Sequence, residues 1–233
     1  MMCYRFRVPF LLALIALIVS ACKSYEPENM TYYVPDRSFR SFLTENGYAV
    51  RVGVKYMRPT ENANNTSYLN CFKKGINSLK GIEMFTSLQY LVCSSNPIVE
   101  LDLGSLRTLR HLYCNEVPLQ MLNLKGCDSL SYLEISEMPL RSLDLSSVPN
   151  IDSVFCILMP IDSLDLSKSS RLKVLYCRGT NIRTLDIRSC PSFQTLHALE
   201  TPLSTLIVTP AQYVSDSIFV SVEDTVSVVV KPL

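Results

Sequence analysis

Residues 86–106, TSLQYLVCSSNPIVELDLGSL, set a pattern that the chain repeats every 21 residues. Five further blocks follow without a gap up to residue 211, and a slightly longer block, 64–85, precedes them. The blocks share the spacing LxxLxCxxxxLxxLDL, which in the first full block is filled by Leu88, Leu91, Cys93, Ile98, Leu101 and Leu103. Self-similarity at a fixed period of about 20–50 residues is the signature of a repeat architecture. The sequence therefore predicts seven stacked units.

The spacing within a block also predicts the path of the chain. The step from Leu91 to Cys93 alternates between two faces, as a short strand requires, and the later leucines bring the chain back on the opposite side of a coil. One coil per block makes a solenoid, in which each coil buries its leucines against its neighbours. Parallel strands about 4.8 Å apart would give a body about 30 Å long.

This spacing resembles the leucine-rich-repeat family, and more closely its internalin-like branch with short repeats and a cysteine ladder. The resemblance covers residues 34–233 and rests on the cysteine in the strand, the LDLS return and the phrase INSLKGIEMFTSLQYL at 76–91. It implies a leucine-rich-repeat solenoid of the α/β horseshoe class, dominated by β-structure. About seven coils of 21–22 residues would carry parallel strands on a concave face, between a short N-terminal helical cap and a C-terminal β cap.

One family feature is missing. The asparagine that follows the strand in relatives appears only as Asn96, so an asparagine ladder is absent. Prolines fix φ, and they follow the equivalent position in most blocks, which makes them a plausible substitute; they are Pro97, Pro118, Pro139, Pro160 and Pro202.

The regularly spaced cysteines are predicted to be core residues. One inward column holds Cys71, Cys93, Cys114, Cys156 and Cys177, with Ile135 and Ala198 at the two other rungs. Interchange with apolar residues indicates that cysteine serves as a small buried hydrophobe. A rung spacing of about 4.8 Å exceeds the roughly 3.5–4.5 Å between Cβ atoms of a disulfide. Cys127 and Cys190 lie three rungs apart in another column, which is too far for a disulfide. The sequence has no CxxC pair and no histidine at a ligand spacing, so we expect no metal site.

The first residues predict export and lipid anchoring. Arg5 and Arg7 precede an apolar run at 8–19 and the small residues before Cys22, which is typical of a signal peptide spanning 1–21. The ending VSAC resembles the lipobox of bacterial lipoproteins, which implies that Cys22 is acylated and holds the chain on a membrane. By analogy with lipoprotein sorting, the lysine after Cys22 favours the bacterial outer membrane, and we expect the domain at the cell surface.

The remaining boundaries follow from composition. Residues 22–33 read as a polar tether, 34–63 as an N-terminal cap, 64–211 as the repeats and 212–233 as a C-terminal cap. Asp36 is a candidate helix cap, and Gly47 a stop. The segment 44–56 lacks the alternating acids of a calcium loop. Near the end, two short strands are expected to close the last coil.

The candidate binding surface is aromatic. The outward positions of the strands are expected to line the concave face, where relatives bind ligands. Large apolar side chains that point to solvent from a sheet often mark a binding surface. They are Tyr90, Tyr113, Tyr132, Phe155 and Tyr176. They are predicted to contact a protein or glycan partner, while the alternative is that cross-strand aromatics only stabilise the sheet.

Other functions find little support. The chain carries a formal charge of +1, and loss of the leader with its two arginines brings it to about −1, which does not favour nucleic acid as a partner. No nucleophile motif or phosphate-binding loop appears, so we expect no enzyme activity and no cofactor. The sequence predicts a lipid-anchored adhesion or interaction module. The alternative is a structural or assembly factor that faces the periplasm and serves another envelope complex.

Overall fold

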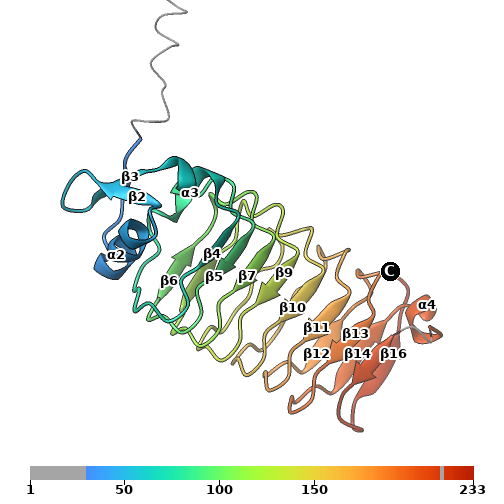
Figure 1. Ribbon diagram of the computed structural model, residues 1–233. Coiled ribbons are helices and arrows are strands. Elements are labelled where there is room, and N and C mark those ends of the chain that lie inside the picture. Colours follow the sequence, from blue (N-terminus) through green and yellow to red (C-terminus); the bar gives the residue numbers. More distant parts are fainter. Residues whose placement is uncertain (1–29, 216–217) are drawn as a thin grey trace, which may run out of the picture.

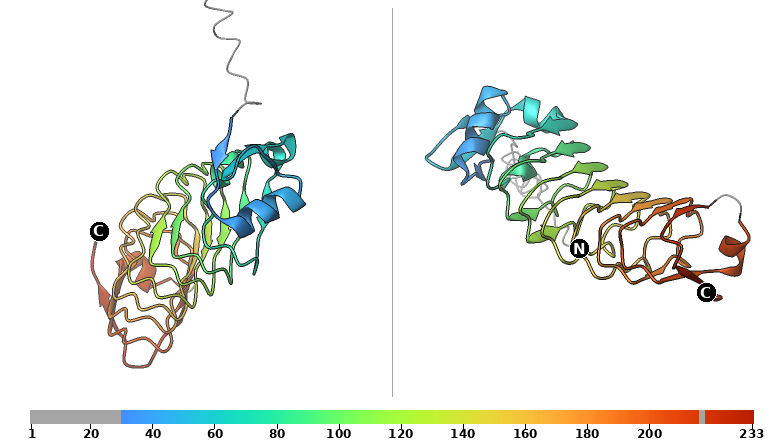
Figure 2. Two further views of the ribbon diagram at one scale, coloured as in Figure 1. Left: turned by 90° about the vertical axis from the view of Figure 1, so that its left-hand side faces the viewer. Right: turned by 90° about the horizontal axis from the view of Figure 1, so that it is seen from below.

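Each repeat contributes one short strand to a parallel sheet that runs along the molecule (Figure 1). The computed structural model describes residues 30–215 and 218–233, so the predicted signal peptide, Cys22 and most of the tether lie outside the described residues. The coils stack along one axis, with the N-terminal elements at one end and the C terminus at the other (Figure 2). The predicted solenoid is confirmed.

The eight-stranded sheet has the order β15-β13-β11-β10-β9-β7-β5-β4. Its strands are β4 (Tyr68–Asn70), β5 (Tyr90–Val92), β7 (His111–Tyr113), β9 (Tyr132–Glu134), β10 (Ser153–Phe155), β11 (Val174–Tyr176), β13 (Thr195–His197) and β15 (Phe219–Ser221). Equivalent leucines pair across neighbouring strands, as Leu91 does with Leu112 and Leu112 with Leu133. The 21-residue sequence period is therefore the register of the sheet.

The opposite side of each coil is less regular. There β6 (Glu100–Asp102) pairs with β8 (Met121–Asn123), and β12 (Thr184–Asp186), β14 (Thr205–Val208) and β16 (Ser227–Val230) form a second small sheet. The aspartates of the LDL phrase make local turns, because each side chain accepts a hydrogen bond from the backbone N–H two residues on. The bonds join Gly104 to Asp102, Ser146 to Asp144, Ser167 to Asp165 and Arg188 to Asp186.

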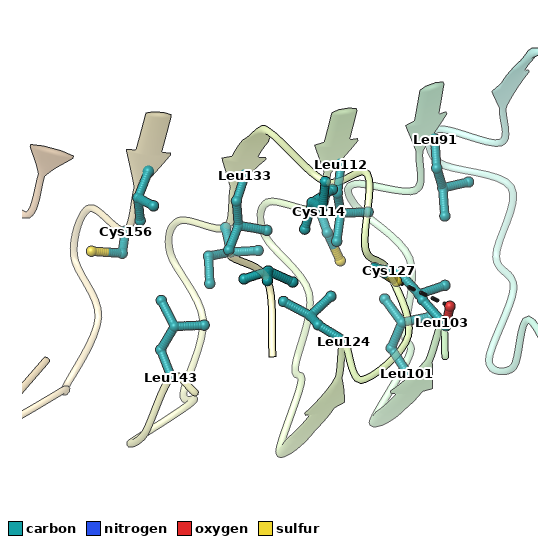
Figure 3. Packing of buried hydrophobic residues seen from close by; sticks show 14 of the residues in the cluster. Leu91, Leu101, Leu103, Leu112, Cys114, Leu124, Cys127, Leu133, Leu143 and Cys156 are labelled. Carbon is teal, nitrogen blue, oxygen red and sulfur yellow. Dashed lines mark hydrogen bonds between the residues drawn. The ribbon is translucent and has the colours of Figure 1, made fainter. Parts of the chain in front are cut away.

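The core fills the space between the two sides of the coil. Leu91, Leu112 and Leu133 point inward from their strands toward leucines of the return side, and the cysteines lie among them (Figure 3). These three leucines are fully buried, and full burial of such a side chain is worth about 1.5–3 kcal/mol. The leucine columns thus supply the main force that stacks the coils.

The cysteines are small members of this core. The seven at positions 71, 93, 114, 127, 156, 177 and 190 are all buried and free. The thiol of Cys71 donates to the carbonyl of Val92 on the next coil at 3.3 Å. The thiol of Cys127 donates to the carbonyl of Leu103 at 3.1 Å (Figure 3). Burial raises the pKa of Cys71 and of Cys177 to about 12, so these thiols stay protonated at neutral pH.

The turn after each strand depends on one residue in the left-handed backbone region. It stands two positions after the cysteine column, and its members are Lys73, Ser95, Glu116, Glu137, Leu158, Gly179 and Glu200. Only one is glycine, although this conformation costs other residues about 1–2 kcal/mol. The N–H group of each non-glycine in the middle coils bonds to the next coil, as from Glu116 to the carbonyl of Ser136 at 3.0 Å. These bonds between coils offset the cost of the left-handed conformation. The prolines lie two residues further along the chain and do not occupy these strained positions.

Asn96 locks the turn between the first two coils. It is 2% exposed, and its side-chain oxygen accepts from the backbone N–H groups of Lys74 and Ile76 at 3.0 and 3.1 Å. Its amide donates to the carbonyls of Cys71 and Cys93 at 2.8 and 2.9 Å. Thr180 and Thr201 occupy the equivalent position in later coils and make one of these bonds, because the hydroxyl of each donates to the carbonyl three residues back.

Separate elements close the two ends. At the front lie β1 (Tyr32–Tyr33), α2 (Arg37–Glu45), the hairpin of β2 (Ala49–Arg51) and β3 (Tyr56–Pro59), α3 (Glu61–Asn65) and the 3-10 turn η3 (Ile82–Met84). Asp36 caps α2 by accepting from Phe39, and its other oxygen accepts from Asn77 of the first coil. The segment 44–56, which lacks calcium-loop acids, ends α2 and enters this hairpin.

At the back, α4 (Pro210–Tyr213) places Gln212 against the coil before it, where its amide donates to the carbonyls of Ile187 and Cys190. The two expected short strands, β15 and β16, are present. They pair in parallel with β13 and β14, so they form one more rung of the solenoid. Within residues 30–215 and 218–233, no helix is long and apolar enough to cross a membrane.

Replacement of Asn96 by alanine tests the turn. The change leaves buried backbone groups on both coils without partners, so we expect the free energy of unfolding to fall by about 2–3 kcal/mol. Chemical denaturation measures this loss. Asn181→Ala is the matched control, because Asn181 is exposed and follows another strand of the same sheet. Equal effects of the two changes would contradict the role of Asn96.

The cysteines provide a second test. Only the thiolate form of cysteine reacts with alkylating reagents. Burial raises the pKa of Cys190 to about 11, as it raises those of Cys71 and Cys177, so little thiolate forms. In the folded chain at pH 8 we expect the seven buried cysteines to resist alkylation, and all seven to react after unfolding without reductant. Peptide mass spectrometry reports each position separately. Disulfides between these cysteines, or rapid alkylation of the folded protein, would contradict the buried ladder.

Candidate functional site: an aromatic row on the parallel sheet

A continuous row of aromatic rings covers the outward face of the eight-stranded sheet. We name this set the aromatic row: Tyr68, Tyr90, His111, Tyr113, Tyr132, Phe155, Tyr176 and His197. Successive ring centroids lie 4.3 Å apart for Tyr90 and His111 and 4.8 Å apart for Phe155 and Tyr176. Strands about 4.8 Å apart place the side chains of one column at stacking distance. The sheet register therefore builds the row.

The row changes column at Tyr132. The rings up to Tyr132 occupy the first residue of their strands, with the exception of Tyr113, whereas Phe155, Tyr176 and His197 occupy the last. Tyr132 bridges the two columns, because its ring lies 5.6 Å from His111, 5.1 Å from Tyr113 and 5.3 Å from Phe155. All five tyrosine and phenylalanine residues predicted for the binding surface lie in this one row.

Two pairs of rings in the row stack face to face. Tyr90 and His111 are nearly parallel, at 4°, and Tyr176 and His197 at 2°. Tyr68 at the end of the row is 53% exposed, while Tyr113, Tyr132, Phe155 and Tyr176 are partly buried. A sugar ring stacks on an aromatic face. In these two pairs each ring has one face against its neighbour, so less ring face remains for a sugar.

Glu134 lies within the row as a fixed carboxylate. It occupies the same column as Tyr113 and Phe155, on the strand between theirs. Its Oε1 accepts from the amide of Asn115 at 2.6 Å, and its Oε2 accepts from the hydroxyl of Tyr132 at 2.8 Å. Burial, followed by the hydrogen bond to Glu134, raises the pKa of the Tyr132 phenol well above its ordinary value. Tyr132 therefore stays protonated and holds the carboxylate in place.

The two histidines also belong to the row, although they were not among the five residues predicted for the binding surface. Each stacks on a tyrosine, and the Nδ1 atoms of His111 and His197 are buried without a hydrogen-bond partner. Burial lowers the pKa of His111, which favours the neutral ring. Their positions in the same two columns as the tyrosines were the signal that could have identified them.

A shallow hollow adjoins the front half of the row. It has a volume of about 410 Å³ and is lined by Tyr68, Phe72, Tyr90, Val92, Ser94, Tyr113, Asn115 and Glu116. A larger hollow of about 600 Å³ lies on the return side, beside Asp102 and Glu100. The turn at Asp102 already uses the carboxylate there, and no aromatic ring lines that hollow. The described residues contain no group of three acidic, cysteine or histidine side chains that could hold a metal ion.

Comparison with known proteins identifies the fold. Neither protein-family models nor curated proteins match the chain. Among solved structures, internalin C2 from Listeria monocytogenes matches at 15% identity and a TM-score of 0.56, over 85% of this chain and 95% of that chain. Internalin F of the same organism matches at 15% identity and a TM-score of 0.39, over 84% and 75% of the two chains.

A third similar structure is the functional domain of InlJ from Listeria monocytogenes, described as including a cysteine ladder. It matches at 16% identity and a TM-score of 0.38, over 85% of this chain, which spans 62% of that one. Together with the strand order, the likeness to internalin C2 establishes the class: the chain has the leucine-rich-repeat solenoid fold of the internalins.

Proposed function

We propose that this chain is a non-enzymatic binding module that docks a protein partner on the aromatic row. The observation that carries the proposal is the row itself, in which partly exposed tyrosine and phenylalanine rings lie side by side on a rigid sheet. Tyrosine and phenylalanine are enriched in protein interfaces, where their large rings bury much area at low entropic cost. The fold shared with internalin C2 is compatible with such a module.

A protein partner fits this surface better than a glycan does. Sugar recognition by stacking needs free ring faces, and the pairs Tyr90–His111 and Tyr176–His197 have theirs against each other. Ring edges, hydroxyl groups and one carboxylate remain for contact. Protein interfaces are enriched in tyrosine and phenylalanine and carry direct hydrogen bonds beside their apolar contacts.

The row also stabilises the sheet. Cross-strand aromatic pairs contribute about 0.2–1 kcal/mol each, and the two roles are compatible. Stacking alone does not account for the position of Glu134, because a carboxylate adds nothing to ring packing and pays to leave water. Its presence between Tyr113 and Phe155 favours a role in recognition.

We propose further that the module is lipid-anchored at the bacterial outer membrane, through acylation of Cys22, and faces the cell exterior. The lipobox-like ending VSAC and the polar segment after it support this placement. The second candidate is a structural or assembly factor of the periplasm, which the same anchor and the same aromatic row would serve.

Site-specific photo-crosslinking in intact cells tests the docking face. A benzophenone amino acid replaces Phe155 in the row, and in a matched strain it replaces Met121, which is 59% exposed on the return-side strand β8. We expect a discrete crosslinked product from position 155 and none from position 121. External protease applied before lysis should degrade the module and its product while a periplasmic marker survives.

Equal crosslinking from both positions, or none from position 155, would contradict docking on the aromatic row. Survival of the module until lysis would contradict surface exposure and leave the periplasmic function. The two readouts are independent, so the binding face and the cellular location are tested separately.

A further inference from the structure

Glu134 is the one charged residue on the outward face of the sheet. The outward positions of the eight strands are otherwise filled by aromatic, hydroxyl, amide and apolar residues, with histidine counted as neutral. A single carboxylate in a neutral, partly buried surface interacts more strongly with an opposite charge than one in open water does. Its location at the centre of the aromatic row makes it a determinant of what the row can bind.

The carboxylate of Glu134 is positioned but not neutralised. Its two bonds come from neutral donors, Asn115 and Tyr132. In the part of the chain that the structure describes, the ion pairs are Arg178–Glu200 and Arg188–Asp186, and neither involves Glu134. A carboxylate can accept about four hydrogen bonds. Two accepting positions of Glu134 therefore remain for a donor from outside the chain.

A second carboxylate faces the adjoining hollow. Glu116 lines the hollow of about 410 Å³ and accepts a hydrogen bond from the hydroxyl of Ser95 at 3.0 Å. Asn115 lies between the two acids: it lines the same hollow as Glu116, and its side-chain amide donates a hydrogen bond to Glu134. Lys73 and Arg110, two basic residues of these coils, form no ion pair within the described residues and do not line the hollow.

We propose that the hollow and Glu134 receive a basic segment of the protein partner, with a lysine or arginine side chain bonded to Glu134 and a second one near Glu116. This inference rests on the proposed function and names the chemistry of its partner. Arginine is enriched in interfaces and binds carboxylates through paired hydrogen bonds. The tyrosine edges of the hollow would pack along the aliphatic part of such a side chain.

Charge favours a basic segment over the other candidates for this surface, which are a second copy of the chain, an acidic partner and a neutral partner. A second copy docked through the same face would bring two Glu134 carboxylates toward each other without a compensating cation, and like charges in an interface are unfavourable. An acidic partner meets the same repulsion. A neutral partner would bury the carboxylate further without supplying an opposite charge, which costs free energy.

A library of cyclic 12-residue peptides displayed on phage tests the inference with the purified full-length protein. Peptides that bind wild type and lose binding to Tyr113→Ala are retained, since they dock on the aromatic row. We expect these peptides to be enriched in lysine and arginine. Their affinity should fall at least about tenfold on Glu134→Gln, and should also fall as salt is raised.

Two further variants keep the test decisive. Glu116→Gln should weaken the same peptides, and it serves as the readout if Glu134→Gln lowers the yield of folded protein. Glu100→Gln is the matched control, because Glu100 is an exposed acid on β6 of the return side, and it should leave affinity unchanged. Circular dichroism shows that each variant is folded.

The outcomes separate this inference from the proposed function. Peptides that depend on Tyr113 but carry no basic residue and tolerate Glu134→Gln would overturn the basic-partner inference and leave the docking face intact. Failure of every binding peptide to respond to Tyr113→Ala would overturn the docking face together with it.

Discussion

The in-register pairing of successive coils is the constraint on which the rest of the structure depends. Once Leu91, Leu112 and Leu133 pair as neighbours, every position of the repeat becomes a column with a spacing of about 4.8 Å. Inward columns become the leucine core and the cysteine ladder, and outward columns become the aromatic row. The same register brings the strained turn residues to the carbonyls that satisfy them, as with Glu116 and Ser136. Burial, turn geometry and the aromatic row thus share one cause.

The solenoid could be predicted from the sequence because each block repeats the same choice between buried and exposed positions. That repetition located the strands, the buried cysteines and the five tyrosine and phenylalanine residues of the surface. The rest depended on three-dimensional contacts. The bridge at Tyr132 requires knowing that rings of two columns meet, and the fixation of Glu134 requires the distance to Asn115 on another coil. The left-handed turn residues could not be predicted, because only Gly179 among them is a glycine.

The two sides of the sheet differ in their chemistry and in their roles. The inward side supplies stability through apolar burial, and the same burial raises the pKa of its thiols, which keeps them protonated at neutral pH. The outward side carries groups that the core cannot use: hydroxyls, imidazoles and a carboxylate without a cation. Since the solenoid backbone depends on the inward columns, outward residues can change chemistry without loss of the fold. This separation explains how a partly buried acid persists at the centre of an otherwise neutral face.

The most direct test of this account compares folding and binding in the same variants. For Tyr113→Ala and Tyr176→Ala, one measures the free energy of unfolding and the affinity for the partner captured by crosslinking. A docking role for the row predicts that the free energy of unfolding falls by at most about 1 kcal/mol for Tyr113→Ala, which loses one ring pair, and about 2 kcal/mol for Tyr176→Ala, which loses two, while affinity falls more than tenfold in both. Unchanged affinity together with a clear loss of stability would show that the row serves only to hold the sheet together, and would contradict the account.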